Sequence, residues 1–148
     1  MSKSEIAKNL MREHHLNWSQ SVLGVYAKEF GLDQNLALKV AMGFGGGMGR
    51  TGKICGAVTG ACMVLGLSQR INENNPRESI ERAYKLVQEF NREFEKIFGS
   101  IICKELIKYD LNSTDGLADA RNKGVFSTTC PNLVNGAVTI LENLLTTC

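Results

Sequence analysis

The sequence predicts an all-α fold, a compact single-domain helical bundle of about five to seven helices. Apolar residues recur at helical spacing through most of the chain, and runs of alternating β-branched residues are lacking. Capping residues and glycines separate these segments, as helix boundaries require. A chain of 148 residues normally forms one domain with a sizeable core. We therefore expect a single helical domain over residues 1–148.

The N-terminal third predicts three helices. The first covers residues 4–14. The second begins at Asn17, and Gln20 three residues later completes a capping-box pattern. Its apolar residues share one face, and Gly31 is expected to end it; they are Trp18, Val22, Leu23, Tyr26 and Phe30. The third helix is expected over residues 33–42.

A glycine-rich segment then precedes a helix of small residues. Six of the ten residues from 43 to 52 are glycine, so we expect no regular element there. A helix is predicted over residues 53–65. Gly56 and Gly60 lie one turn apart in it, each followed by alanine, and small residues at this spacing let another backbone approach closely. This segment is therefore expected to be a central, buried helix.

The longest helix is expected to begin after Asn75, which is the predicted N-cap. Pro76 takes the first helical position, and Glu78 is expected to complete a capping box with Asn75. Its apolar residues repeat at helical spacing until Gly99. A short helix follows Ser100, and residues 110–129 are expected to form a loop with one or two helical turns. Because proline is favoured at the first position of a helix, the last helix is expected over residues 131–145.

Composition excludes several classes of function. The net charge is +2 and basic runs are lacking, so we expect no binding to nucleic acid. The N-terminus lacks an apolar signal-peptide core, which predicts a cytoplasmic protein. The most apolar stretch, residues 54–67, is too short to cross a membrane.

Cysteines are the residues most able to carry chemistry here. Cys55, Cys103 and Cys130 each lie where a helix is predicted to begin, and the unpaired N–H groups of a helix N-terminus lower a thiol pKa. If the three meet, they form a redox or metal site; a single buried cysteine is more often inert core. Cys62 is expected to be core, and Cys148 an exposed terminal thiol.

The glycine-rich segment also contains a phosphate-loop pattern. Residues 47–53 match G-x-x-x-x-G-K, but a helix precedes them and Ile54 replaces the Ser or Thr that would bind magnesium. A phosphate-binding enzyme is therefore kept only as a minor third alternative. A milder prediction is that Gly47, Gly49 and Lys53 stabilise an anion such as the Cys55 thiolate. His14 and His15 show no ligand spacing.

The segment Cys55-Gly-Ala-Val-Thr-Gly60 resembles the CGAxxG motif of the C_GCAxxG_C_C family, whose members are described as redox-active. The similarity extends to residues 17–23, the glycine-rich segment and residues 98–106. It implies a single-domain helical protein of bacteria or archaea. It also implies four cysteines, of which three correspond to Cys55, Cys103 and Cys130. Trp18 stands where the family has its first cysteine.

Two hypotheses follow. In the first, Cys55, Cys103 and Cys130 converge as redox thiols or as ligands of zinc or an iron–sulfur cluster, with Cys62 as a candidate fourth ligand and Cys55 as the most activated thiol. In the second, the chain is a non-catalytic accessory module that binds a small ligand or partner beside Trp18 and has a degenerate cysteine site. The redox partner, any enzymatic activity and a homodimer through the helix of small residues remain open.

Overall fold

The computed structural model describes residues 1–146 and confirms the all-α fold. Seven helices of this part of the chain have eight residues or more: α1 (Lys3–His14), α2 (Trp18–Tyr26), α3 (Gln34–Ala41), α5 (Gly56–Leu67), α6 (Pro76–Phe98), α8 (Thr114–Asn122) and α9 (Val125–Thr146). Shorter elements are the 3-10 helix η1 (Met42–Phe44), α4 (Gly45–Met48) and α7 (Cys103–Ile107). Cys148 lies outside the described residues.

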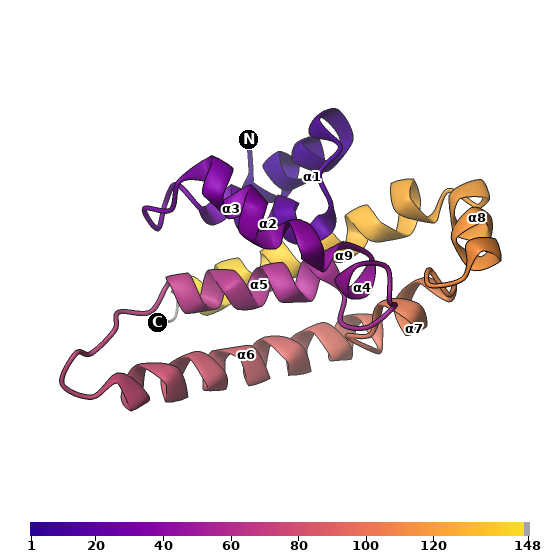
Figure 1. Cartoon of the computed structure of the whole chain (residues 1–148). Coiled ribbons are helices and arrows are strands. Elements are labelled where there is room, and N and C mark those ends of the chain that lie inside the picture. The colour runs from indigo at the N-terminus through magenta and orange to yellow at the C-terminus, as the bar shows by residue number, and fades with distance from the viewer. Residues whose placement is uncertain (147–148) are drawn as a thin grey trace.

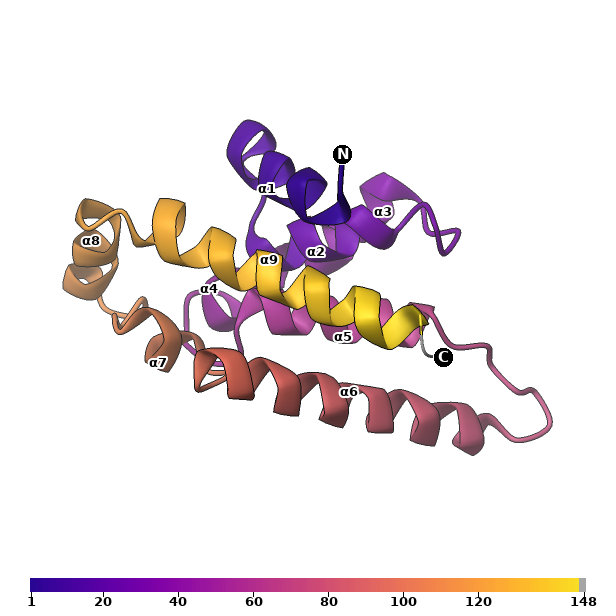
Figure 2. The same cartoon turned by 180° about the vertical axis from the view of Figure 1, so that it is seen from behind.

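The helices form three layers. Figure 1 shows α5 and α9 in the middle, α1 to α3 on one side and the long α6 on the other, and Figure 2 shows the same layers from behind. The short helices α4 and α7 lie together near one end of α6, with α8 beyond them. The buried apolar residues form one cluster. No helix within residues 1–146 combines the length and apolar character needed to cross a membrane.

Helix α5 is central and packs closely on α2, as its small residues predict. A Cβ atom added to Gly60 would lie 2.8 Å from the carbonyl oxygen of Ser19 and 3.0 Å from the Cβ of Val22. A Cβ on Gly56 would lie 3.2 Å from the amide nitrogen of Ser19. The two glycines therefore let the backbones of α5 and α2 approach each other directly.

The predicted capping box of α2 is present. The side chain of Asn17 accepts a hydrogen bond from the amide of Gln20 at 2.9 Å, and the Gln20 side chain accepts one from the amide of Asn17 at 3.0 Å. The Asn17 side chain also donates to the Met42 carbonyl at 2.8 Å, which ties the start of α2 to the end of α3. Helix α2 ends at Tyr26, earlier than expected, and Gly31 closes the following turn with φ 73°.

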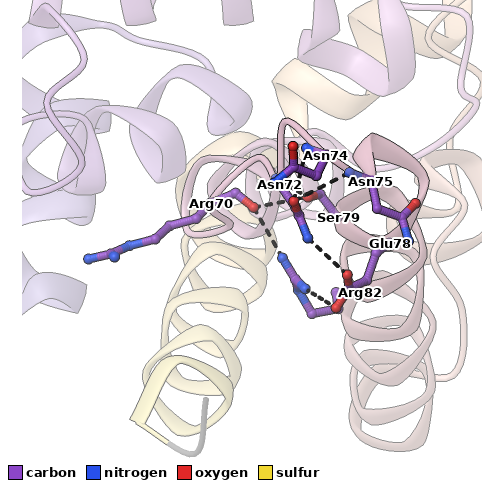
Figure 3. Close-up of polar contacts among 7 residues, drawn as sticks. All are labelled: Arg70, Asn72, Asn74, Asn75, Glu78, Ser79 and Arg82. Carbon is purple, nitrogen blue, oxygen red and sulfur yellow. Dashed lines mark hydrogen bonds and ion pairs between the residues drawn. The ribbon is translucent and has the colours of Figure 1, made fainter.

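The predicted capping box of α6 is wrong, although Pro76 does take the first helical position. The Asn75 side chain makes no capping bond. Ser79 instead donates to the Arg70 carbonyl and accepts from the Asn72 amide, while Glu78 accepts from the Asn72 side chain (Figure 3). Because Glu78 bonds to the preceding loop, that loop closes against the first turn of α6.

Two expectations for the C-terminal third are also wrong. Ser113 caps α8 by accepting from the Gly116 amide at 2.9 Å, so much of the polar segment is helical. Gly124, with φ 68°, interrupts the helical conformation between α8 and α9. Its carbonyl then accepts hydrogen bonds from the amides of Ser127 and Thr128. Helix α9 therefore begins at Val125, and Pro131 lies inside it.

Candidate functional site

Backbone pairing brings Cys55 and Cys103 to the same place. Ile54 and Ile102 form an isolated antiparallel bridge. The Cys55 amide donates to the Ile101 carbonyl at 2.8 Å, and the Cys103 amide donates to the Lys53 carbonyl at 2.6 Å. Because successive side chains in extended backbone point to opposite faces, the side chains of Cys55 and Cys103 share the face opposite the two isoleucines.

Each of these cysteines stands at a helix N-terminus, as predicted. Cys55 is the N-cap of α5 and Cys103 is the first residue of α7. Cys130 is different: it lies within α9, so the prediction that it begins a helix is wrong. The physical reason is the helix break at Gly124, after which the backbone is continuously helical through residue 130.

The three thiols nevertheless affect one another. Burial raises the pKa values of Cys103 and Cys130, and the proximity of other ionisable thiols adds to this rise: Cys55 acts on Cys103, and Cys55 and Cys103 both act on Cys130. The side chains of all three are fully buried. The cysteines thus lie close enough to interact electrostatically inside the core.

The predicted lowering of the thiol pKa values is wrong. Burial raises the pKa of Cys55 to about 11, even though backbone hydrogen bonds from Ala57 and Val58 act to lower it. Burial raises the pKa of Cys103 to about 12 and that of Cys62 to about 11. The free energy lost by removing a thiolate from water exceeds the stabilisation of that thiolate by the helix N-terminus. These groups are therefore neutral thiols near pH 7.

Gly47 closes one side of this site. It has φ 69°, and an added Cβ would lie 2.7 Å from the Cβ of Cys103 and 2.6 Å from the amide nitrogen of Lys53. The Gly49 and Lys53 amides donate to the carbonyls of Gly45 and Gly47. The amides of Gly49 and Lys53 are therefore used within the loop, and the loop shapes the site without offering these N–H groups to an anion.

The residues do not fit a metal centre. Within residues 1–146, no group of three or more His, Cys, Asp or Glu side chains is arranged to hold a metal ion. Cys55, Cys62, Cys103 and Cys130 are all free of disulfides. The expected zinc or iron–sulfur ligand set, with Cys62 as fourth ligand, is therefore not formed.

Trp18 lies beside the start of α5. Trp18 is 6% exposed, and a Cβ added to Gly56 would lie 3.5 Å from the Cβ of Trp18. Position 18 is therefore next to the helix that Cys55 caps. The indole also lines two neighbouring cavities of about 480 and 600 Å³.

The cavities involve residues that sequence reasoning did not assign to a site. His15, Leu16, Arg121 and Phe126 line both cavities together with Trp18. They come from the α1–α2 connection, α8 and α9, and no spacing rule relates such distant segments. Only the packing of the helices brings them together.

No curated protein and no solved structure matches this chain. A family model does match, and it covers residues 16–144. This range includes the capped start of α2, the glycine-rich segment, Cys55, Cys103 and Cys130. The chain therefore belongs to the C_GCAxxG_C_C family, which is described as "Putative redox-active protein".

Proposed function

We propose that this protein is a thiol redox protein in which Cys55 and Cys103 form the reactive pair and Cys130 is a third, neighbouring thiol. The observation that carries the proposal is the Ile54–Ile102 bridge, which puts Cys55 and Cys103 on one face. Family membership supports the redox class. Since the described residues form no metal site, the proposed chemistry uses sulfur alone.

The proposed reaction is thiol–disulfide exchange with a small-molecule disulfide. One cysteine loses its proton and attacks the incoming disulfide, which forms a mixed disulfide and releases one small thiol. The second cysteine then attacks the protein sulfur of the mixed disulfide and releases the second small thiol. Two cysteine thiols are oxidised to one disulfide, and one external disulfide is reduced to two thiols.

Burial must slow this exchange. The thiols are fully buried and their pKa values are raised, so the folded protein presents little thiolate at neutral pH. Reaction therefore needs local opening. Helix α7, which begins at Cys103, has only five residues, and short elements with few contacts open at the lowest cost.

The test is oxidation of the reduced protein in glutathione buffers of graded redox potential, followed by alkylation and mass spectrometry of peptides. The expected product is a Cys55–Cys103 disulfide. Cys55→Ser and Cys103→Ser should abolish it, whereas Cys62→Ser, at the half-buried cysteine of the same α5 helix, should leave it unchanged. Thiols that stay reduced in every buffer, or a disulfide formed mainly by Cys62, would reject the proposal.

A second candidate function is the binding of a small ligand beside Trp18, with the cysteines inherited and unused. The two cavities lined by Trp18 favour it. Trp18 is the only tryptophan of the chain, so its fluorescence reports directly on this site. A change in that emission on ligand binding, unaffected by Cys55→Ser, would support this function.

A further inference from the structure

The two cavities beside Trp18 are parts of one cleft. Both are lined by the same five residues: His15, Leu16, Trp18, Arg121 and Phe126. The first extends toward the glycine-rich segment at Gly46 and Arg50, and the second extends toward Met11 and Pro131. Volumes of about 480 and 600 Å³ are those of small-molecule sites.

The charged residues of this cleft all have the same sign. Lys8, Arg12, Arg50 and Arg121 line one or both cavities, and no described carboxylate does so. Arg12 is already paired with Glu13 at 3.2 Å. Arg50 and Arg121 make no ion pair or side-chain hydrogen bond with any residue in the described range 1–146. Two guanidinium groups therefore remain available to a ligand.

The glycine-rich segment makes room for one of these cations. Gly46 has φ 65°, and a Cβ on it would lie 2.8 Å from the Cγ of Arg50. A side chain at position 46 would therefore displace the stem of Arg50. The run of glycines, which resembles a phosphate loop without being one, here lets Arg50 lie against the backbone at the wall of the cleft.

Aromatic rings form the apolar part of the cleft. The rings of Trp18 and Phe126 lie 6.0 Å apart between centroids at an angle of 37°. Met11, Leu16 and Pro131 extend this apolar surface. Flat apolar groups pack favourably against such rings, while a guanidinium binds carboxylate, sulfonate or phosphate oxygens through paired hydrogen bonds.

We infer that the cleft binds a small organic anion with an aromatic or other apolar body, its anionic group at Arg50 and Arg121 and its body against Trp18 and Phe126. This inference rests on the second candidate function and holds whether or not the thiols are redox-active. It adds the chemical class of the ligand.

The test compares two probes that share one arene. 1-Anilinonaphthalene-8-sulfonate carries an anionic group, and N-phenyl-1-naphthylamine lacks it. Titration of the full chain, followed by Trp18 emission and probe emission, should show saturable one-to-one binding of the sulfonate. Removing one cation from a charge-assisted hydrogen bond weakens binding about tenfold, so Arg121→Gln should raise the Kd of the sulfonate by that factor.

Lys96→Gln is the matched control, because Lys96 is also in the last turn of its helix but belongs to α6, which does not line the cleft. It should leave the Kd unchanged, and circular dichroism should show both variants folded. Benzoate or phenyl phosphate is expected to displace the probe. Equal displacement by inorganic phosphate would refute the inference that the ligand has an apolar body.

The remaining outcomes separate two failures. Equal binding of the neutral and anionic probes, or an unchanged Kd in Arg121→Gln, would overturn the anionic class while leaving a ligand site beside Trp18. No binding of either probe, with Trp18 emission unchanged, would overturn both the inference and the second candidate function.

Discussion

The contact between α2 and α5 can be tested by adding one methyl group. In Gly60→Ala, the new Cβ would lie 2.8 Å from the Ser19 carbonyl oxygen, 3.0 Å from the Val22 Cβ and 3.2 Å from the Ser19 Cα. Ordinary contacts begin at 3.4 Å. Two of the three neighbours are backbone atoms, which cannot rotate away, so the helices must separate by several tenths of an ångström.

Two opposing effects set the magnitude. Overpacking of a core costs about 1–3 kcal/mol. Alanine is favoured over glycine inside a helix by about 1 kcal/mol. Gly66→Ala is the matched control, because Gly66 lies in the same helix and its added Cβ would meet no atom within 4 Å. The difference between the two variants therefore measures the packing cost, and Gly60→Ala should be the less stable by about 1–3 kcal/mol.

Urea unfolding followed by far-ultraviolet circular dichroism measures both free energies. For a chain of this size, 1 kcal/mol corresponds to a change in Tm of about 2–4 °C, so thermal unfolding gives a second estimate. Gly66→Ala should be slightly more stable than the unaltered protein. If Gly60→Ala were stabilised as much as Gly66→Ala, the direct approach of the α2 and α5 backbones would be refuted.

Three further predictions follow. Gly47→Ala should unfold the glycine-rich segment or destabilise the chain by more than about 3 kcal/mol, because φ 69° and the 2.6 Å approach to the Lys53 amide exclude a Cβ; normal urea unfolding would contradict this. Ser79→Ala should cost about 1–3 kcal/mol, since the Asn72 amide and the Arg70 carbonyl lose their partner, whereas a change within error would show that water replaces the hydroxyl. The free energy of unfolding should fall as pH rises from about 9 to about 12, because the unfolded Cys103 thiol loses its proton in this range while the folded one retains it; Cys103→Ala should make the fall shallower, and an identical slope would contradict the raised pKa.

Local interactions were predictable from the order of residues. The Asn17 capping box depends on two side chains three residues apart, and the helical repeat of α6 depends on spacing alone. Where a distant group entered, such predictions failed. Glu78 bonds to the Asn72 side chain in the preceding loop instead of completing a box, and Gly124 starts α9 before Pro131.

The cysteine site shows the same division. The CGAxxG motif around Cys55 identifies the family, and the helix starts at Cys55 and Cys103 were visible in the sequence. The direction of the thiol pKa shifts was not predictable from the sequence, because it depends on how completely the folded chain removes water from the sulfur atoms.

The sequence alone determined the helical class, the boundaries set by local caps and the family, because hydrogen bonds between near neighbours and the periodicity of apolar residues act over a few positions. Tertiary structure decided which thiols are buried together and that Arg50, Arg121 and Phe126 meet Trp18 in one cleft. Burial and charge at a site come from residues far apart along the chain, and only the packed helices bring those residues within reach of one another.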